Sequence, residues 1–330
     1  MKIHRFFDSV YHDNALRQAR KRAFWGDLAR YLGNKSLRPL EERLVRRFRT
    51  TEQPIVFIVG VPRSGTTLLF QLMARHLPVG FVNNFMARFW MAPIVGGMVY
   101  RYLHGERESS IPLKSRLGAT PGPDSPHEFS WFWEYWAEFG DRDEYTRDEL
   151  AQMNWSAIRR ELEGLAGWFG RPLVLKSINY VNYHIPWIAE RFPSARFLRI
   201  RRSATHVAQS IYESREKRYD DPSIWWSVRP ADVDQWLDEP AARQIAHQIN
   251  HIDDAVEEGL GVVDDSRQMT TWYEDLTGNP VRTLASVGSL LGVDVEHATA
   301  LEKLGLSPRN RQRLPDETFE KLALALAETS

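Results

Sequence analysis

The sequence predicts an α/β fold in three layers, with a central parallel sheet of about four or five strands flanked by helices and carrying helical insertions. Short apolar runs of the kind found in buried parallel strands occur at residues 55–59, 173–176, 196–200 and 269–273. Segments with apolar residues at helical spacing separate these runs. A length of 330 residues is enough for one large core of this type.

The first of these strands opens the stretch around which the chain is organised, residues 55–76. Pro54 precedes five apolar residues, and the following loop is bounded by Gly60 and Gly65. From Thr66 onward, apolar residues recur at helical spacing, at Leu68, Leu69, Leu72 and Met73. The order strand, glycine-bounded loop, helix N-terminus is typical of phosphate binding, because loop N–H groups and the positive end of the helix dipole face the same point.

The loop nearly matches the GxxxxGK[ST] phosphate loop of ATPases. Thr66 stands where the lysine of that motif should be, and the nearby cation is Arg63 inside the loop. Such a loop suits one terminal phosphate, held by backbone, an arginine fork and two hydroxyls, better than a triphosphate. A simple Gly/Pro turn between a core strand and a core helix is the structural alternative.

The motif PRSGTTL after an apolar strand resembles the 5′-phosphosulfate loop of the sulfotransferases that use 3′-phosphoadenosine 5′-phosphosulfate (PAPS). It is most similar to the Arg-containing form of tyrosylprotein, carbohydrate and many bacterial members, and with the landmarks below the resemblance covers about residues 54–295. The resemblance implies a P-loop-like fold in which the 5′-phosphosulfate is held by Arg63, Ser64, Gly65, Thr66 and Thr67.

A second landmark follows the strand at 196–200. Arg202 and Ser210 are eight residues apart, with Ser210 on a helix predicted for residues 203–214. The resemblance implies that this pair holds the 3′-phosphate of the donor, and a bidentate arginine with a hydroxyl near a helix N-terminus suits a dianion. Relatives often read RxPRD where this chain has Ser203 to His206, and surface arginines beside a core helix are the structural alternative.

The segment YEDL at 273–276 resembles the family segment whose tyrosine contacts the adenine, which implies this role for Tyr273. The family's GxxGxxK loop has no counterpart near the C-terminus. Arg309, Arg311 and Arg313 are the candidates there for a further contact with the 3′-phosphate.

The catalytic residues are expected at Lys176 and Glu128, together with Arg63. Lys176 ends the strand at 173–176, and the resemblance implies that it contacts the transferring sulfuryl group and the bridging oxygen. Cytosolic relatives carry a catalytic histidine two residues later, where this chain has Ile178. Some relatives use a glutamate instead, so Glu128 is the candidate general base and His127 its rival.

Glu128 also has a structural interpretation. It lies in an aromatic-rich segment, residues 127–136, that is predicted to be helical, with Pro126 at the first position and Ser125 or Asp124 as the cap. A glutamate in the first turn of such a helix could serve capping alone. His184, on a helix predicted for residues 183–192, is interpreted as structural.

The predicted organisation is a basic helical extension at residues 1–50 packed on a single sulfotransferase domain at 51–330. Segments 85–170 and 213–260 are expected to be insertions on the substrate side. Residues 1–50 hold thirteen Lys/Arg against five Asp/Glu, a net charge of +8. Their apolar residues at helical spacing (Ala15, Ala19, Ala23, Phe24, Leu40, Leu44 and Phe48) are expected to face the core. The charged face is solvated, or docks on an anionic surface or an oligomer partner.

The composition limits the chemistry. The chain has no cysteine, which excludes disulfides, thiolate nucleophiles and Cys-ligated metals, and its His and carboxylate spacings indicate no metal site. No signal peptide or transmembrane segment is apparent, so the expected location is cytoplasmic, with peripheral membrane contact left open. A nucleic-acid partner is not expected.

The sequence therefore predicts a PAPS-dependent sulfotransferase that acts on a hydroxyl of a carbohydrate, glycolipid or other small molecule and releases 3′-phosphoadenosine 5′-phosphate (PAP). A P-loop kinase and a nonenzymatic protein that binds nucleotides or anionic surfaces are the alternatives.

Overall fold

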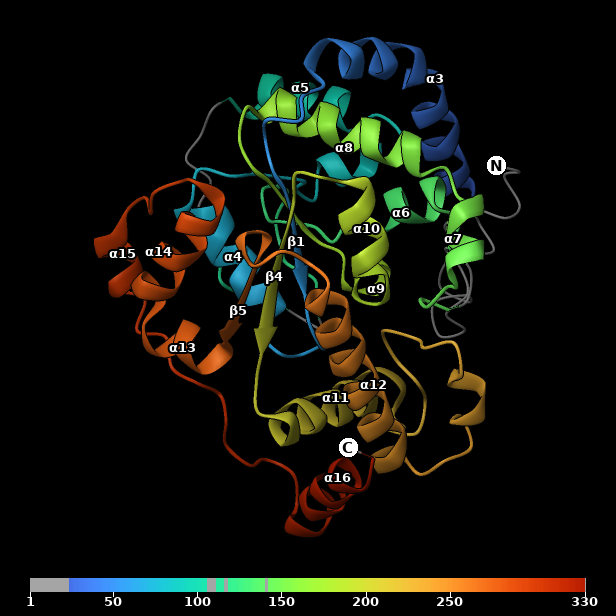
Figure 1. The fold of residues 1–330 in the computed structure, drawn as a ribbon, viewed down its shortest axis with the longest axis vertical. Helices are drawn as coiled ribbons and strands as arrows, with labels where there is room; N and C mark the ends of the chain where they lie inside the picture. The colour runs from blue at the N-terminus through green and yellow to red at the C-terminus, as the bar shows by residue number, and fades with distance from the viewer. Residues whose placement is uncertain (1–23, 106–110, 116–117, 140–141, 330) are drawn as a thin grey trace.

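The computed structural model describes residues 24–105, 111–115, 118–139 and 142–329. A five-stranded parallel sheet, with the order β2-β3-β1-β4-β5, lies at its centre (Figure 1). The strands are β1 (Ile55–Val59), β2 (Gly80–Phe81), β3 (Leu173–Lys176), β4 (Ala195–Arg201) and β5 (Gln268–Trp272). The three-layer fold predicted from the apolar runs is confirmed, and β1 and β3 have the predicted bounds.

Helices cover both faces of the sheet because its strands are apolar on both sides. Ile55, Phe57 and Val59 of β1 belong to one buried cluster, whereas Val56 and Ile58 belong to another. The first cluster includes residues of α8 (Trp155–Phe169), α9 (Ile178–Val181), α10 (Ile185–Arg191) and α12 (Ala241–Gly261). The second includes residues of α4 (Thr66–His76), α13 (Tyr273–Gly278) and α14 (Pro280–Leu291).

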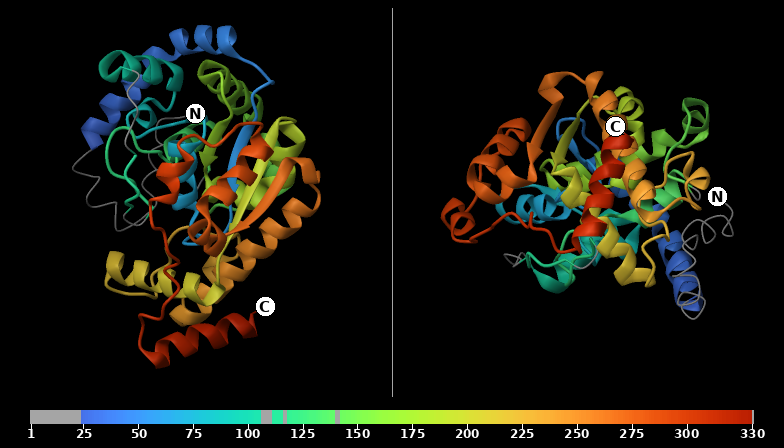
Figure 2. Two further views of the ribbon diagram at one scale, coloured as in Figure 1. Left: turned by 90° about the vertical axis from the view of Figure 1, so that its left-hand side faces the viewer. Right: turned by 90° about the horizontal axis from the view of Figure 1, so that it is seen from below.

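The remaining helices lie around this core (Figure 1). They are α3 (Phe24–Phe48), α5 (Pro93–His104), α6 (Ser130–Trp136), α7 (Arg147–Gln152), α11 (Ala204–Tyr219), α15 (Ala298–Glu302) and α16 (Asp316–Glu328). Short 3-10 turns lie at η1 (Met86–Phe89), η2 (Asn182–His184), η3 (Val233–Gln235) and η4 (Asp265–Arg267). Figure 2 shows α16 against α11 and α12, at the end opposite α3. In the part of the chain that the structure describes, no helix is both long and apolar enough to cross a membrane.

Some helices differ from their predicted bounds for local reasons. Residues 147–169 form two helices, α7 and α8, because Asn154 caps a new start by accepting a hydrogen bond from the Ala157 N–H at 3.2 Å. The helix predicted for 183–192 becomes η2 followed by α10. The helix predicted for 203–214 continues to Tyr219, so the connection between α11 and α12 starts at Asp220.

The inward face of α3 was predicted only in part: Leu44 and Phe48 pack against the core, whereas Phe24 and Leu40 are exposed. Leu40 is 48% exposed, whereas Glu41 and Asn34 are buried. Both polar side chains satisfy backbone groups next to α5: the Glu41 carboxylate accepts from the N–H groups of Ile94 and Val95 at 2.9 and 3.0 Å. Asn34 donates to the Arg88 carbonyl at 2.8 Å. The helix is therefore oriented by polar contacts that apolar periodicity cannot reveal. The predicted positions Ala15, Ala19 and Ala23 lie outside the described residues.

The sheet brings the predicted landmarks to one edge. Lys176 pairs with Ile58 one residue before the end of β1, and Arg201 pairs with Trp272. The loop after β1, the end of β3, Arg202 after β4 and Tyr273 after β5 therefore follow four neighbouring strands at their carboxyl ends. This is the edge at which open α/β sheets bind ligands.

Candidate functional site

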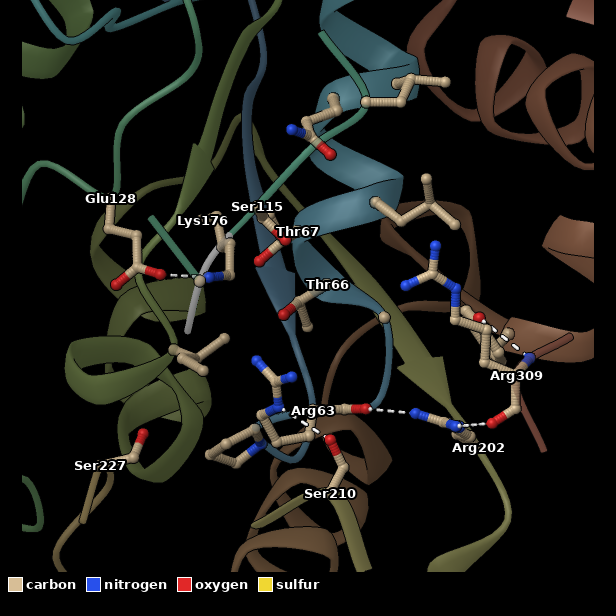
Figure 3. A pocket seen from close by; sticks show the side chains of 18 of the residues that line it. Arg63, Thr66, Thr67, Ser115, Glu128, Lys176, Arg202, Ser210, Ser227 and Arg309 are labelled. Carbon is tan, nitrogen blue, oxygen red and sulfur yellow. Dashed lines mark hydrogen bonds and ion pairs between the residues drawn. The ribbon is translucent and has the colours of Figure 1, made fainter. Parts of the chain in front are cut away.

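A cleft of about 1490 Å³ lies at the carboxyl edge of the sheet. Most of the predicted site residues line it: Arg63, Gly65, Thr66, Thr67, Glu128, Lys176, Arg202, Ser210 and Tyr273. Figure 3 shows Thr66 and Thr67 between the Glu128–Lys176 pair on one side and Arg63, Ser210 and Arg202 on the other. Ser64 and His127 are not among the lining residues. Ser64 is 1% exposed, and among the described residues its hydroxyl has no hydrogen-bond partner.

The loop after β1 depends on its two glycines. Gly65 has φ +108°, and a Cβ there would lie 2.7 Å from Cδ2 of Tyr273. Gly60 has φ +134°, and a Cβ there would lie 2.6 Å from the Ile200 carbonyl oxygen. Both positions therefore exclude side chains by backbone conformation and by space. Because Gly65 is the N-cap of α4 and offers no capping side chain, the first N–H groups of the helix remain available to an anion.

A buried asparagine that the sequence analysis missed fixes the start of the loop. Asn182 accepts from the Gly60 N–H at 3.1 Å and donates to the Gly60 carbonyl at 3.0 Å. The contact spans 122 positions of the chain, so no local sequence signal identifies it.

Arg63 joins the two predicted anion-binding groups. Its Nε donates to the Ser210 hydroxyl at 3.0 Å, and its carbonyl accepts from Nη1 of Arg202 at 3.1 Å. The backbone of Arg63 is left-handed, with φ 72°, a conformation that is rare and strained outside glycine and is found preferentially at functional sites. The phosphate loop and the Arg202–Ser210 pair thus form one continuous surface.

Arg202 also ties the C-terminal segment to the cleft. Its Nε donates to Oδ1 of Asn310 at 2.8 Å, its Nη2 donates to the carbonyl of Arg309 at 2.9 Å, and its guanidinium lies 4.6 Å from the Tyr273 ring centroid. A guanidinium has five N–H donors. The three hydrogen bonds to Arg63, Asn310 and Arg309 therefore leave two N–H groups for a ligand.

The electrostatics of this end favour an anion. Burial, followed by the positive charge of Arg202, lowers the pKa of Arg63. Burial also lowers the pKa of Arg202 itself. A phosphate between the two guanidiniums would relieve both effects, because opposite charge stabilises the protonated form.

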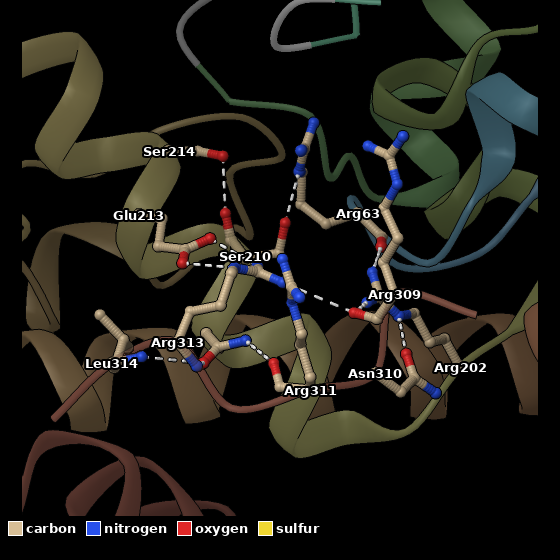
Figure 4. Close-up of polar contacts among 11 residues, drawn as sticks. Arg63, Arg202, Ser210, Glu213, Ser214, Arg309, Asn310, Arg311, Arg313 and Leu314 are labelled. Atoms are coloured by element: carbon tan, nitrogen blue, oxygen red, sulfur yellow. Dashed lines mark hydrogen bonds and ion pairs between the residues drawn. The ribbon is translucent and has the colours of Figure 1, made fainter. Parts of the chain in front are cut away.

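The C-terminal segment adds further arginines (Figure 4). Arg309, Arg311 and Arg313 all line the cleft. Gln209 holds the segment in place, since it donates to the Arg311 carbonyl at 3.0 Å and accepts from the Arg313 N–H at 2.6 Å. Arg313 forms a 2.6 Å ion pair with Glu213. Arg309 and Arg311 have no ion pair to any described carboxylate, which leaves their charges for a ligand.

Glu128 and Lys176 form an ion pair in the cleft. Lys176 is nearly buried, at 4% side-chain exposure, whereas Glu128 is 41% exposed. Ser177 supports the glutamate: its hydroxyl accepts from Trp133 Nε1 at 2.8 Å and donates to the Glu128 carbonyl at 3.3 Å. Glu128 and Lys176 are 48 residues apart in sequence but lie in contact, because β3 and the segment before α6 come together at the edge of the sheet.

The predicted capping role of Glu128 is wrong. Helix α6 begins at Ser130, because Phe129 is left-handed with φ 58°. The predicted caps are used elsewhere: the Ser125 hydroxyl donates to the Pro121 carbonyl at 2.5 Å, and the Asp124 carboxylate accepts from the hydroxyl of Tyr100. Glu128 therefore lies before the helix and faces Lys176 instead.

Both histidines near the site use ring nitrogens in hydrogen bonds to the backbone. His127 Nδ1 accepts from the Phe129 N–H at 2.8 Å, and burial lowers the pKa of His127. A neutral ring that accepts at Nδ1 carries its proton on Nε2, so neither nitrogen is free to take a proton. His184 is buried among Phe139 and Tyr145, and its pKa is lowered to about 4 by burial, in agreement with a structural role.

The other end of the cleft contains residues that the sequence analysis did not single out. They are Ser130, Trp131, Glu134, Asp143, Asn179, Tyr180, Trp226 and Ser227. They come from α6, from the segment before α7, from α9 and from the connection between α11 and α12. That connection is held by α12, since Gln248 Nε2 donates to the carbonyls of Trp226 and Val228 at 2.9 and 2.8 Å. In the described part of the chain, no group of three or more His, Asp or Glu residues could hold a metal ion.

Comparison with known proteins gives a consistent result. The model of a family described as the sulfotransferase family matches residues 54–297. The structure is similar to sulfotransferase STF1 from Mycobacterium tuberculosis H37Rv, with a TM-score of 0.52 and 16% identity over 97% of this chain and 90% of that chain. It is also similar to sulfotransferase STF9 from Mycobacterium avium, with a TM-score of 0.52 and 16% identity over 84% of this chain and 76% of that chain. At this identity the likeness concerns the fold. No curated protein matches the sequence.

Proposed function

The chain belongs to the sulfotransferase family, and from this premise we propose that it transfers the sulfuryl group of PAPS to a hydroxyl group of an acceptor. The observation that carries the proposal is the junction of Arg63, Ser210 and Arg202, which joins two anion-binding groups into one surface. A nucleotide with phosphates at both its 5′ and 3′ positions presents two anionic groups to such a surface.

In the proposed complex, the loop residues Arg63, Ser64, Gly65, Thr66 and Thr67 hold the 5′-phosphosulfate, mainly through backbone N–H groups, the Arg63 guanidinium and the threonine hydroxyls. The buried position of Ser64 gives it a structural part in this loop. Arg202 and Ser210 bind the 3′-phosphate, joined by Arg309 and Arg311. Tyr273, which is packed against Gly65 and Arg202, contacts the adenine.

The transfer step uses the ion pair. The acceptor oxygen attacks the sulfur in line with the leaving oxygen, a bond forms between acceptor oxygen and sulfur, and the bond from sulfur to the 5′-phosphate of PAP breaks. Glu128 takes the proton of the acceptor hydroxyl. Lys176 donates hydrogen bonds to the sulfuryl group and the leaving oxygen, which stabilises the negative charge that develops there.

The acceptor is proposed to be a carbohydrate, a lipid or another small hydroxylated molecule. Glu128 and Trp131 belong to segment 85–170 and Trp226 to segment 213–260, and all three line the cleft. This supports the proposal that these two segments form the acceptor side, whereas the strand ends form the donor side.

Calorimetry tests the donor. We expect PAP to bind at least about 100-fold more tightly than ATP, since the loop lacks the lysine of triphosphate-binding loops. Tighter binding of ATP would favour the kinase alternative. Labelled PAPS offered with a panel of hydroxylated acceptors then tests transfer, and PAP binding without transfer to any acceptor would favour a nonenzymatic role.

A further inference from the structure

The acceptor end of the cleft contains a carboxylate whose chemistry narrows the class of acceptor, an inference that rests on the proposed function. Asp143 lines the cleft in the segment before α7. Its Oδ2 accepts from the Arg229 N–H at 2.8 Å and from Nδ2 of Asn179 at 3.1 Å. Within the described residues, Oδ1 accepts no hydrogen bond and no cation lies within ion-pair distance of the carboxylate.

This carboxylate is fixed in place on both sides. The Asp143 N–H donates to the Arg229 carbonyl at 2.8 Å, so Asp143 contacts the backbone of Arg229 through both its own backbone and its carboxylate. Next to it, Glu144 accepts from the Ala231 N–H at 2.8 Å and contacts His251 Nε2 at 2.9 Å. Asp143 therefore cannot swing into solvent without breaking the contact between two segments of the cleft wall.

The positive charge of Arg229 compensates Asp143 only in part, because burial outweighs it. Burial raises the pKa of Asp143 to about 7. The neighbouring hydroxyl of Tyr180 donates to Oε1 of Glu134 at 2.7 Å, and the pKa of Tyr180 is raised well above its usual value by burial and then by the negative charges of Glu134 and Asp143. Two carboxylates, Glu134 and Asp143, therefore line the cleft in addition to the Glu128–Lys176 pair.

Two indoles complete this end of the cleft. Trp131 is packed edge-on against Trp90, with ring centroids 4.5 Å apart, and Trp226 is held by Gln248 through its carbonyl. Both indoles line the same cleft as Asp143. Aromatic faces together with a carboxylate are surroundings in which proteins bind ammonium groups, by ion pairing and cation–π contact.

We propose that Asp143 binds a protonated amine of the acceptor through Oδ1, so that the acceptor is an amine-bearing alcohol, such as an amino sugar or an amino alcohol, whose hydroxyl faces Glu128. An anionic acceptor is disfavoured because a like charge would be buried beside Asp143 and Glu134. A neutral polyol could donate a hydrogen bond to Oδ1 but would leave the buried charge uncompensated.

The test compares acceptors that differ in one group. Methyl glucosaminide is measured against methyl glucoside, and an amino alcohol against the diol of equal length, with labelled PAPS and by calorimetry on the PAP complex. We expect kcat/KM and affinity to be at least about tenfold higher for the amine of each pair, the difference between a charge-assisted and a neutral hydrogen bond. In Asp143→Asn this preference should disappear, since Asn keeps an oxygen for Arg229 and Asn179 but lacks the charge.

Asp234→Asn is the matched control, because Asp234 is 88% exposed on the connection between α11 and α12, which also carries Arg229, and does not line the cleft. It should keep the amine preference of the parent. Equal activity and affinity for both members of each pair in the parent would overturn the inference while leaving the sulfotransferase proposal intact, and this comparison does not depend on the folding of a variant. Absence of PAP binding in the parent would overturn the proposed function, and the inference with it.

Discussion

Replacement of Glu128 by Gln tests the proposed base most directly. The substitution keeps the size of the side chain and removes its ability to take a proton. Loss of a general base lowers turnover by about 10²- to 10⁴-fold, which corresponds to about 3–5 kcal/mol in the activation barrier. We therefore expect kcat in Glu128→Gln to fall by at least about 100-fold.

The structure predicts that this loss affects the chemical step alone. Lys176 is nearly buried and Glu128 is its partner, so an Ala substitution would leave a buried charge unpaired. Gln retains an oxygen that can accept from Lys176, and the 41% exposure of Glu128 limits the cost further. The donor end is built by other segments. PAP affinity should therefore change by less than about threefold, and the free energy of unfolding by less than about 1 kcal/mol.

The assay combines single-turnover transfer from labelled PAPS, calorimetry with PAP and urea unfolding. Glu258→Gln, an exposed glutamate on α12, serves as the matched control and should behave as the parent. Turnover within threefold of the parent, with PAP affinity preserved, would refute the assignment of Glu128 as the base. A parallel loss of PAP affinity would instead assign the residue to donor binding.

Four further predictions follow from particular contacts. Arg202→Lys keeps the charge but loses the planar fork, so PAP should bind at least about tenfold more weakly in calorimetry, and unchanged affinity would contradict the role of this residue. Gly65→Ala should reduce PAP affinity or unfold the loop, because the new Cβ would collide with Tyr273; a crystal structure with an unchanged loop and unchanged affinity would exclude this. His127→Gln should retain turnover within about threefold, since both ring nitrogens are occupied, and a 100-fold loss in kcat would revive His127 as the base. The pKa of Glu41 is raised from 4.5 to about 7, mainly by burial, so its contribution to the free energy of unfolding is complete below pH 4.5 and is lost as the pH rises to 7, by at most about 3 kcal/mol. In Glu41→Gln, urea unfolding should no longer show this dependence of stability on pH. The same pH dependence in both proteins would show that the carboxyl titrates normally.

The parts of the fold that depend on local sequence were predictable. Five apolar residues between Pro54 and Gly60 are sufficient to place β1. The order strand, loop, helix at residues 55–76 was also predictable, because the glycines of the loop, its arginine and its threonines are close together in sequence. The closeness of Arg202 and Ser210 was predictable because it depends only on one strand that is followed directly by one helix.

The parts that depend on distant contacts were not predictable. The start of α6 was placed wrongly because Phe129 adopts a left-handed backbone where Pro126 favours helix. Asn182 forms a hydrogen bond with Gly60, which is 122 positions away in sequence. Asp143, in the segment before α7, accepts a hydrogen bond from Arg229, on the connection between α11 and α12. A single sequence contains the residues of such pairs but carries no signal for which partner each will meet.

The order of the strands has a consequence for how this protein could be re-engineered. The proposed donor contacts arise at the ends of β1, β4 and β5, whose positions are fixed by pairing at about 4.8 Å between neighbours. Most of the proposed acceptor contacts are carried by two connections outside the sheet, between β2 and β3 and between α11 and α12. A chimaera that takes only these two connections from another sulfotransferase should acquire the acceptor preference of that enzyme and keep its own nucleotide-binding residues. Acceptor recognition and donor binding could then be changed separately.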